Sequence, residues 1–476
     1  MKKSYLYLSV LLLPVVAQAQ ETTKSHSPNI VFILADDMGY GDVSSYNPRS
    51  KIQTPNIDQL AKEGMRFTDA HSGGSSCISS RYALLTGRFA VRKPMSLANG
   101  PLIEKGRMTV ASMLRQQGYA TVMVGKWHLG FDPYLQNKEA PVDYSPPLIG
   151  GPVDCGFESF FGMHASLDLP PYFYIRDRAP VTPPDEDVSA NSSINGPEGW
   201  NHNQGEFWRA GKIASDFKFE QVTPRFAAEA VSVIHNHAST TQDKPLFLYL
   251  ALPSPHTPWL PLEVFRGKSR AGMYGDFVVQ VDAVVGQVLD ALKTTGIDQD
   301  TLVIFSSDNG PLWYDKDRER FRHDAAGGLR GKKFDSWEGG HRMPFLVRWP
   351  RRVAANHVCD QTVVFSDMLA TFAELVGFQE IPRGMAEDSV SFLPYLLNAA
   401  KKPERRPPII HDQRTVRDGN WKLILPKEGE NTNANAAAEL YNLQEDLCER
   451  TNQVSQHPEI AQRLEQHLSA LIDVGQ

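Results

Sequence analysis

Residues 30–37 have the sequence IVFILADD, an apolar run that stops at two aspartates, Asp36 and Asp37. Continuous β-branched and aromatic runs of this length are typical of strands buried on both faces of a sheet. Three more apolar runs end in polar residues: Thr121 to Val124 before Gly125, Lys126, Trp127 and His128; Leu246 to Leu252 before Pro253, Ser254, Pro255 and His256; and Leu302 to Phe305 before Ser306, Ser307, Asp308, Asn309 and Gly310. The sequence therefore predicts four buried strands with polar groups at their ends.

Helical patterns lie between these runs. Thr54 with Pro55 begins one that Gly64 ends, and Thr109 begins another that Gly118 ends. Two more helices are expected at Val281 to Leu292 and Met368 to Leu375. Alternating strands and helices predict an α/β fold with a large mixed, mostly parallel sheet flanked by helices. Because ligands of such sheets collect beyond the carboxyl ends of the strands, we expect one shared polar site there.

The remaining chain divides into a long loop and a tail. Proline and aromatic residues interrupt the pattern from Phe131 to Lys212, which predicts either a loop that shapes specificity or a passive insertion. After Pro382 a smaller C-terminal α+β subdomain is expected, with a small antiparallel sheet. Its signals are a hairpin at Asp418 and Gly419 before Trp421 to Leu425, a strand at Leu440 to Leu443 and a helix at Pro458 to Ile472. The predicted division is a catalytic domain at 25–382 and a C-terminal subdomain at 383–476.

The composition is that of a globular protein. Of 476 residues, 41% are hydrophobic and 22% charged, and 49 Lys and Arg against 55 Asp and Glu give a formal charge of -6. Because there is no basic surplus, we expect no nucleic-acid partner. Only four cysteines occur, so disulfides are not the main source of stability, and spacing leaves open whether Cys155, Cys359 and Cys448 pair.

The first 19 residues have the features of a signal peptide. Lys2 and Lys3 precede an apolar stretch from Tyr5 to Ala17, and small residues end at Ala19, after which we expect cleavage. The alternative is a membrane anchor, but the run is shorter than the ~20 residues that a span needs. No later run is long enough to cross a bilayer, so the predicted protein is secreted or periplasmic, without stable membrane insertion.

The strand ends offer ligands for a metal ion. Asp36 and Asp37 follow one strand, and Asp308 and Asn309 follow another. Such oxygen donors suit Ca²⁺ or Mg²⁺ rather than zinc. Either pair alone would more often be a turn or helix cap, but the two pairs together favour a metal.

Residues 75–88, SSCISSRYALLTGR, form the most specific segment of the chain. Glycines and serines mark a loop that leads into a short helix, which places Cys77 near a helix N-terminus, where an anion is favoured. Arg81 lies one turn later on the same face. Taken alone, Cys77 could be a thiol nucleophile or an ordinary core residue.

Cys77 to Arg88 resembles the signature of the type I sulfatases, a branch of the alkaline phosphatase superfamily. The chain departs from that signature at Ser79, where proline or alanine is usual. The resemblance extends from Pro28 to Asn452. Its other marks are Gly125 to His128, Pro255 to Pro258, Leu329 to Gly340 with Lys332 and Lys333, Trp421 to Leu423 and Glu439 to Tyr441.

The resemblance implies a modified cysteine. A formylglycine-generating maturation enzyme would oxidise Cys77 to 3-oxoalanine (formylglycine), whose hydrate is the family's nucleophile. One calcium ion, in preference to magnesium, would bind Asp36, Asp37, Asp308, Asn309 and the residue at 77. Counting back four from Trp337 selects Lys333 over Lys332. The implied catalytic residues are Cys77, Arg81, Lys126, His128, His256 and Lys333; Lys126, His256 and Lys333 would also bind substrate.

The implied chemistry is sulfate ester hydrolysis. Calcium, together with Arg81, Lys126 and Lys333, would balance the negative charge on the sulfate oxygens. His256 would protonate the leaving oxygen, and His128 would take a proton as sulfate is expelled. The expected substrates are sulfated glycans or glycosaminoglycan sugars, with galactose or N-acetylgalactosamine sulfates as candidates. Alternatives are phosphoester hydrolysis and an inactive sulfoglycan-binding protein. Candidate specificity residues are Trp259, Trp313, Arg318, Arg320, Arg322, His323, His341 and Arg342.

Overall fold

The computed structural model describes residues 27–97, 100–132, 143–196, 198–240, 244–398, 405–427 and 438–473. The predicted signal peptide and its cleavage site lie outside the described residues. Among the described helices, none combines the length and the apolar composition that crossing a bilayer requires.

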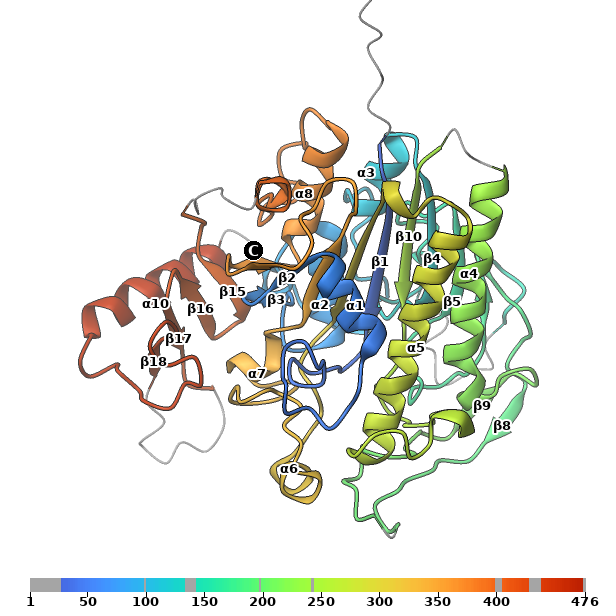
Figure 1. Cartoon of the computed structure of the whole chain (residues 1–476), viewed down its shortest axis with the longest axis horizontal. Helices are drawn as coiled ribbons and strands as arrows, with labels where there is room; N and C mark the ends of the chain where they lie inside the picture. Colours follow the sequence, from blue (N-terminus) through green and yellow to red (C-terminus); the bar gives the residue numbers. More distant parts are fainter. Residues whose placement is uncertain are drawn as a thin grey trace, which may run out of the picture.

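A ten-stranded mixed sheet forms the centre of the larger part of the molecule (Figure 1). The strands lie in the order β13 (His357–Cys359), β2 (Met65–Phe67), β12 (Phe345–Arg348), β11 (Thr301–Ser307), β1 (Asn29–Ala35), β10 (Leu246–Ala251), β4 (Ala120–Lys126), β5 (Ser159–Met163), β6 (Ile175–Arg176) and β7 (Ala179–Pro180). The four predicted strands are the neighbours β11, β1, β10 and β4, and they run parallel. The predicted fold class is therefore confirmed.

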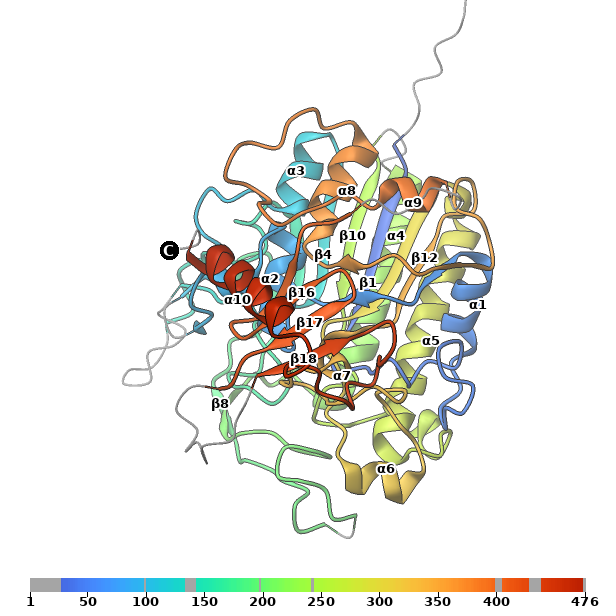
Figure 2. The ribbon, with the colours of Figure 1, turned by 90° about the vertical axis from the view of Figure 1, so that its left-hand side faces the viewer.

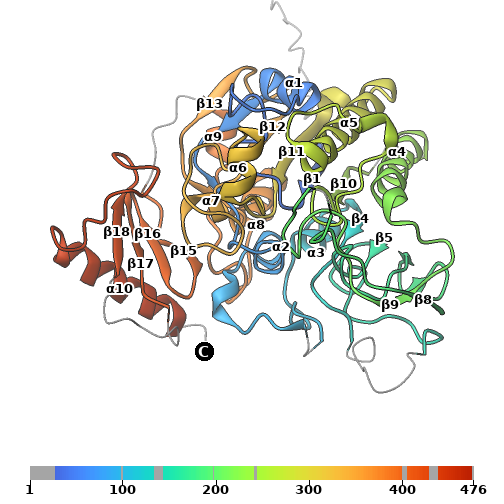
Figure 3. The same ribbon diagram turned by 90° about the horizontal axis from the view of Figure 1, so that it is seen from below.

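Helices cover both faces of this sheet (Figures 2 and 3). One layer contains α1 (Pro55–Glu63), α4 (Val222–Thr240) and α5 (Gly272–Thr294), and the other contains α2 (Cys77–Thr86), α3 (Val110–Gln116) and α8 (Asp367–Val376). Shorter helices are α6 (Asp315–Phe321), α7 (Glu338–His341) and α9 (Leu393–Leu397), and the remaining short strands are β3 (Ala70–His71), β14 (Val363–Val364), β8 (Glu186–Val188) and β9 (Gly211–Ile213). The sheet is thus buried between the two layers, as its apolar strands require.

Local signals account for most helix ends. The hydroxyl of Thr109 accepts a hydrogen bond from the backbone N–H of Ser112, which caps α3 as expected. One start was predicted wrongly, because α5 begins at Gly272 and not at Val281. Its first turns contain a buried acid, Asp276, which breaks the apolar pattern but accepts hydrogen bonds from the backbone of residues 267 and 269.

The prediction of a loop throughout Phe131 to Lys212 is wrong in part. β5 lies inside this range and pairs in parallel with β4, and β6 to β9 lie there as well. The segment of β5 is only five residues long. Its sequence, SFFGM, lacks β-branched residues and contains a glycine, so it gives little strand signal.

The C-terminal residues form a small antiparallel sheet with one helix. β15 (Ile409–Asp412), β16 (Thr415–Asp418), β17 (Trp421–Ile424) and β18 (Glu439–Asn442) lie in sequence order, and α10 (Pro458–Asp473) packs on β16 and β17. This confirms the expected subdomain, seen beside the large sheet in Figure 1. The domain boundary at residue 382 stays a prediction, since α9 contacts α8 and the small sheet begins at Ile409.

Candidate active site

The register of the sheet aligns the ends of its central strands. Ala35 of β1 lies opposite Ser307 of β11. Leu34 of β1 lies opposite Ala251 of β10, which in turn lies opposite Gly125 of β4. The residues that end or follow these strands therefore share one edge: Asp36, Asp37, Lys126, His128, His256, Asp308 and Asn309.

Helix α2 brings Cys77 to the same edge from the neighbouring layer. The helix begins at Cys77 after Ser76, and the thiol is buried. Donor atoms of Asp36, Asp37, Cys77 and His256 all lie within 4.8 Å of one another. Burial raises the pKa of the Cys77 thiol to about 11, so burial works against a thiolate at this position.

Arg81 connects three of these elements. Its Nε and Nη2 donate to Asp308 Oδ2 over 3.0 and 2.7 Å, and its Nη1 donates to the carbonyl of Lys126 over 2.9 Å. Burial disfavours the charged guanidinium, but Asp308 and other nearby anions hold the pKa of Arg81 above its usual value. Arg81 therefore fixes the ends of β11 and β4 relative to α2.

Two lysines pair with the two aspartates that follow β1. The Lys126 ammonium donates to Asp36 Oδ2, and the Lys333 Nζ lies 2.7 Å from Asp37 Oδ1. Both lysines are buried, whereas the partly exposed Lys332 pairs with Asp335. Burial opposes the charge of Lys333, but Asp37 holds its pKa above the ordinary value. The structure thus brings Lys333, and not Lys332, to the site.

The two predicted histidines lie close to this cluster. Burial, with Lys126 and Arg81, holds the pKa of His128 well below its usual value, so this imidazole is neutral at neutral pH. His256 Nε2 lies 3.7 Å from Asp37 Oδ2, and its Nδ1 lies 2.7 Å from the carbonyl of Thr257.

Sequence reasoning missed two polar neighbours of these histidines. Ser166 Oγ lies 3.5 Å from His128 Nδ1, and Asp168 Oδ1 lies 3.9 Å from His256 Nδ1. Both residues follow β5, the strand that sequence reasoning did not find. Their only signal in the sequence would have been that strand end.

The four oxygen-bearing side chains fit a hard cation. Asp36 Oδ1 and Asn309 Oδ1 are buried without a hydrogen-bond partner, while Asn309 Nδ2 donates to Asp37 Oδ1 over 2.7 Å. Burial and the neighbouring Asp36 raise the pKa of Asp308 to about 6. A divalent cation would relieve this crowding of acids, and carboxylate and amide oxygens are the donors that Ca²⁺ prefers.

The candidate specificity residues lie in different surroundings and stay predictions. Trp259, His323, His341 and Arg342 are buried and contact other protein groups. Trp313 and Arg318 line a cavity of about 640 Å³ together with Arg330, Lys332, Trp337 and Arg450. Arg320 donates to the carbonyl of Glu198, and Arg322 ends α6. All four cysteines are free thiols.

A second group of donors, His71, His341 and His411, lies where the C-terminal sheet meets the larger part. Nδ1 of His71 lies 3.0 Å from Nδ1 of His341, and the rings of His341 and His411 stack at 3.6 Å. Parallel stacked rings direct their nitrogen lone pairs along separate planes, so one ion does not suit both. This cluster shares no residue with the strand-end site.

Comparisons with known proteins match this arrangement. The family model described as Sulfatase matches residues 28–378. An N-acetylgalactosamine-6-O-sulfatase of Bacteroides thetaiotaomicron is 31% identical, with 95% of each chain covered. Human arylsulfatase A is 32% identical over 87% of this chain and 78% of its own.

A solved structure from the glycosaminoglycan metabolism of Bacteroides thetaiotaomicron superimposes with a TM-score of 0.81 at 30% identity, covering 94% of this chain and 100% of the other. The family match spans every residue gathered at the strand ends, from Asp36 to Lys333. Fold, sequence and site therefore agree that this chain belongs to the sulfatase family and is a sulfuric ester hydrolase.

Proposed function

We propose that this protein is an exported sulfatase that removes sulfate from sulfated carbohydrates, using a formylglycine made from Cys77. The observation that carries the proposal is the position of Cys77 within 4.8 Å of Asp36 and Asp37. The substrate class rests on the names of the relatives, among them N-acetylgalactosamine-6-O-sulfatase.

The cations of the site suit a sulfate ester. Sulfate oxygens carry diffuse negative charge, so hydrolysis depends strongly on fixed positive groups. Lys126 and Lys333 are buried, and each pairs with an aspartate at the strand ends. Their ammonium groups would orient the sulfate oxygens, and Arg81 would hold Asp308 in place.

The two histidines suit the proton transfers. In its protonated form, His256 would donate a proton from Nε2 to the sugar oxygen as the S–O bond breaks, since its Nδ1–H is directed at the Thr257 carbonyl. His128 is held neutral and so would accept a proton when sulfate is released. The formylglycine hydrate, when present at 77, supplies one hydroxyl for attack on sulfur and a second that allows sulfate to be eliminated.

A calcium ion is the proposed metal. Asp36, Asp37, Asp308, Asn309 and the residue at 77 would hold it, and its charge would favour an ionised oxygen nucleophile. The buried oxygens without partners at Asp36 and Asn309 support this assignment. Calcium is proposed rather than magnesium because flexible multi-oxygen sites suit the larger ion.

The proposal includes export and maturation. Signal peptide cleavage near Ala19 would release a secreted or periplasmic enzyme, and a formylglycine-generating enzyme would convert Cys77. Ser79, which replaces the usual proline or alanine, would have to be accepted by that enzyme. It lies on α2, two residues after Cys77, and its Oγ accepts a hydrogen bond from Ser76 over 3.1 Å.

The test is a screen of defined sulfated mono- and disaccharides with enzyme from the native host. We expect sulfate release from galactose or N-acetylgalactosamine sulfates and none from Cys77→Ala. Intact mass of the peptide around Cys77 should show the lighter aldehyde form. Release of phosphate but not sulfate, or a peptide that contains only thiol, would contradict the proposal.

A further inference from the structure

Phe334, the residue after Lys333, has a strained backbone. Its φ angle is 74°, in the left-handed region that bulky residues avoid. Such a conformation costs about 1–3 kcal/mol and persists only where the surroundings hold it. Here the Phe334 N–H donates to the carbonyl of Ser75 over 2.9 Å, two residues before Cys77. The strain therefore lies directly between the Cys77 loop and Lys333.

The strained residue presents an aromatic ring to solvent. Phe334 is 63% exposed and is the one exposed aromatic residue in the part of the chain that the structure describes. Its ring centroid is 5.2 Å from the Lys333 ammonium, which itself lies 2.7 Å from Asp37 Oδ1. The ring is thus next to a buried cation of the site, yet most of it has no protein neighbour.

Folding alone gives no reason for this arrangement. A phenylalanine gains stability when buried, and a glycine would adopt φ 74° without cost. Phe334 therefore gains little stability from burial and also pays the cost of an unfavourable backbone angle. The tryptophans expected to stack on sugars, Trp259 and Trp313, are only 1% and 4% exposed, far less than Phe334.

We propose that Phe334 is a binding platform for the sugar ring of the substrate, a role that rests on the proposed function. The apolar C–H face of a pyranose would lie on the phenyl ring while its sulfate reaches Lys333. Aromatic faces bind such surfaces through apolar contact and through their negative electrostatic face, which polarised C–H groups approach favourably. The strained backbone then holds the ring at the entrance to the site.

The test compares Phe334→Gly with Phe334→Tyr. Glycine removes the ring and also the backbone strain, so we expect a Tm that does not fall and a KM for the sulfated sugar that rises about tenfold. Tyrosine keeps an aromatic face and should stay within about twofold of wild type. Inorganic sulfate, used as a competitive inhibitor, contacts only the anion site, so its Ki should be unchanged in both variants.

Three outcomes would overturn the platform. An unchanged KM in Phe334→Gly would show that the ring does not bind the sugar. A sulfate Ki that rises as much as the KM, or a KM in Phe334→Tyr as high as in Phe334→Gly, would indicate a distorted site. If wild-type enzyme releases no sulfate from any sugar, the proposed function fails together with the platform, whereas the first three results leave that function intact.

Discussion

At the scale of single residues, the site is a nearly balanced set of buried charges. Lys126 pairs with Asp36, Lys333 with Asp37, and Arg81 with Asp308. A buried charge is tolerated when it is paired with an opposite charge. Removal of one partner leaves the other charge buried and unpaired, which strongly destabilises the folded state. An incoming sulfate changes this balance, because its oxygens compete with the aspartates for the same cations. A metal ion bound to Asp36 and Asp37 would replace the lysines as their partner, so that Lys126 and Lys333 could bind the substrate sulfate.

This pairing predicts different effects for two adjacent lysines. Lys333→Ala should lower kcat by about 100-fold or more, because a buried positive group near the reacting oxygens is lost. Lys332→Ala is the matched control and should stay near wild type, since Lys332 bonds Asp335 and is partly exposed. Steady-state kinetics on the best sulfated sugar would measure both. A larger fall in kcat in Lys332→Ala than in Lys333→Ala would show that Lys332, and not Lys333, is the lysine of the site.

The identities of these residues could be predicted from the sequence, but some of their surroundings could not. Asp36 and Asp308 were predictable because each closely follows an apolar run, Asp36 after Ile30 to Leu34 and Asp308 after Leu302 to Phe305 and two serines. Ser166 and Asp168 were not, since they follow β5, whose sequence SFFGM gives little strand signal. The exposure of Phe334 also has no sequence signal, since neither its backbone angle nor its contact with Ser75 can be inferred from the residues around it.

At the scale of elements, the central strands were predictable because nearly all their residues are buried, with only Asn29, Ala120 and Val122 partly exposed. Such strands need continuous β-branched and aromatic runs, and these are rare elsewhere in the chain. The start of α5 was missed because Asp276 and Gln280 are buried polar residues on an otherwise apolar face. Their hydrogen bonds to backbone N–H groups, which sequence does not reveal, make that burial tolerable.

One glycine sets the distance between two central strands, and this can be tested. Gly125 has φ 115°, and a Cβ there would lie 2.0 Å from the carbonyl oxygen of Ala251. Gly125→Ala should therefore lower the free energy of unfolding by about 3 kcal/mol or more. Gly118→Ala is the control, because Gly118 has φ 84° but open space around it, and it should lose only about 1–2 kcal/mol. If denaturant titrations show that both variants lose the same free energy of unfolding, the close approach of Gly125 to the Ala251 carbonyl does not limit the side chain at this position.

The histidine cluster at the C-terminal sheet predicts acid sensitivity. Burial, with neighbouring His341 and His71, holds the pKa of His411 well below its usual value, and neither ring nitrogen of His411 has a hydrogen-bond partner. A histidine with a lowered folded pKa stays neutral in the native state while the unfolded chain takes up protons below about pH 6.5. The contribution to stability is therefore complete above that pH and is lost progressively as the pH falls.

Thermal unfolding between pH 7.5 and pH 5 would measure this loss. We expect His411→Phe to show a shallower fall in Tm than wild type, because one unprotonated buried histidine is removed. His202→Phe is a suitable control, since His202 is exposed and should leave the pH dependence of Tm unchanged. If His411→Phe and His202→Phe follow the same curve as wild type, the cluster does not govern acid stability.

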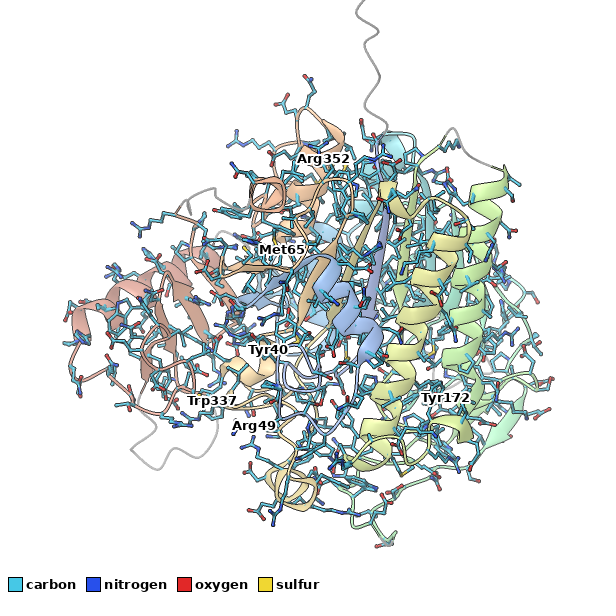
Figure 4. All side chains as sticks on the ribbon, viewed as in Figure 1. Tyr40, Arg49, Met65, Tyr172, Trp337 and Arg352 are labelled. Carbon is cyan, nitrogen blue, oxygen red and sulfur yellow. The ribbon has the colours of Figure 1, made fainter. Side chains whose placement is uncertain are left out.

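At the scale of the whole molecule, the two parts dock through buried charges together with apolar contacts, since Phe89 and Val364 of the larger part pack into the apolar core of the small sheet. Arg417 of the small sheet lies 2.7 Å from Asp69, and Lys422 lies 3.0 Å from Glu338 of α7. Figure 4 labels Trp337, which lies beside α7 at this boundary, and its indole N–H donates to Glu439 over 2.9 Å. In the sequence these residues look like ordinary surface charges, so the docking could not be predicted.

At the same scale, the proposed calcium site would make calcium a determinant of global stability. The proposed ligands follow β1 and β11, two central strands that are far apart in the sequence, and Asp36 Oδ1 and Asn309 Oδ1 are buried without partners. A ligand that binds only the folded state stabilises it by about 2.7 kcal/mol at 100 times its Kd. Calcium should therefore raise Tm by several degrees over enzyme dialysed against chelator, measured by scanning calorimetry.

Two controls separate a specific site from general ionic effects. Magnesium at the same concentration should raise Tm less, because the smaller ion needs stricter octahedral geometry and sheds its water reluctantly. Asn309→Ala removes one proposed oxygen ligand, and its Tm should respond less to calcium than that of wild type. Equal shifts with both ions, or an undiminished calcium response in Asn309→Ala, would mean that the four strand-end side chains do not bind calcium. The charge balance at the site would then depend on the lysine pairs alone.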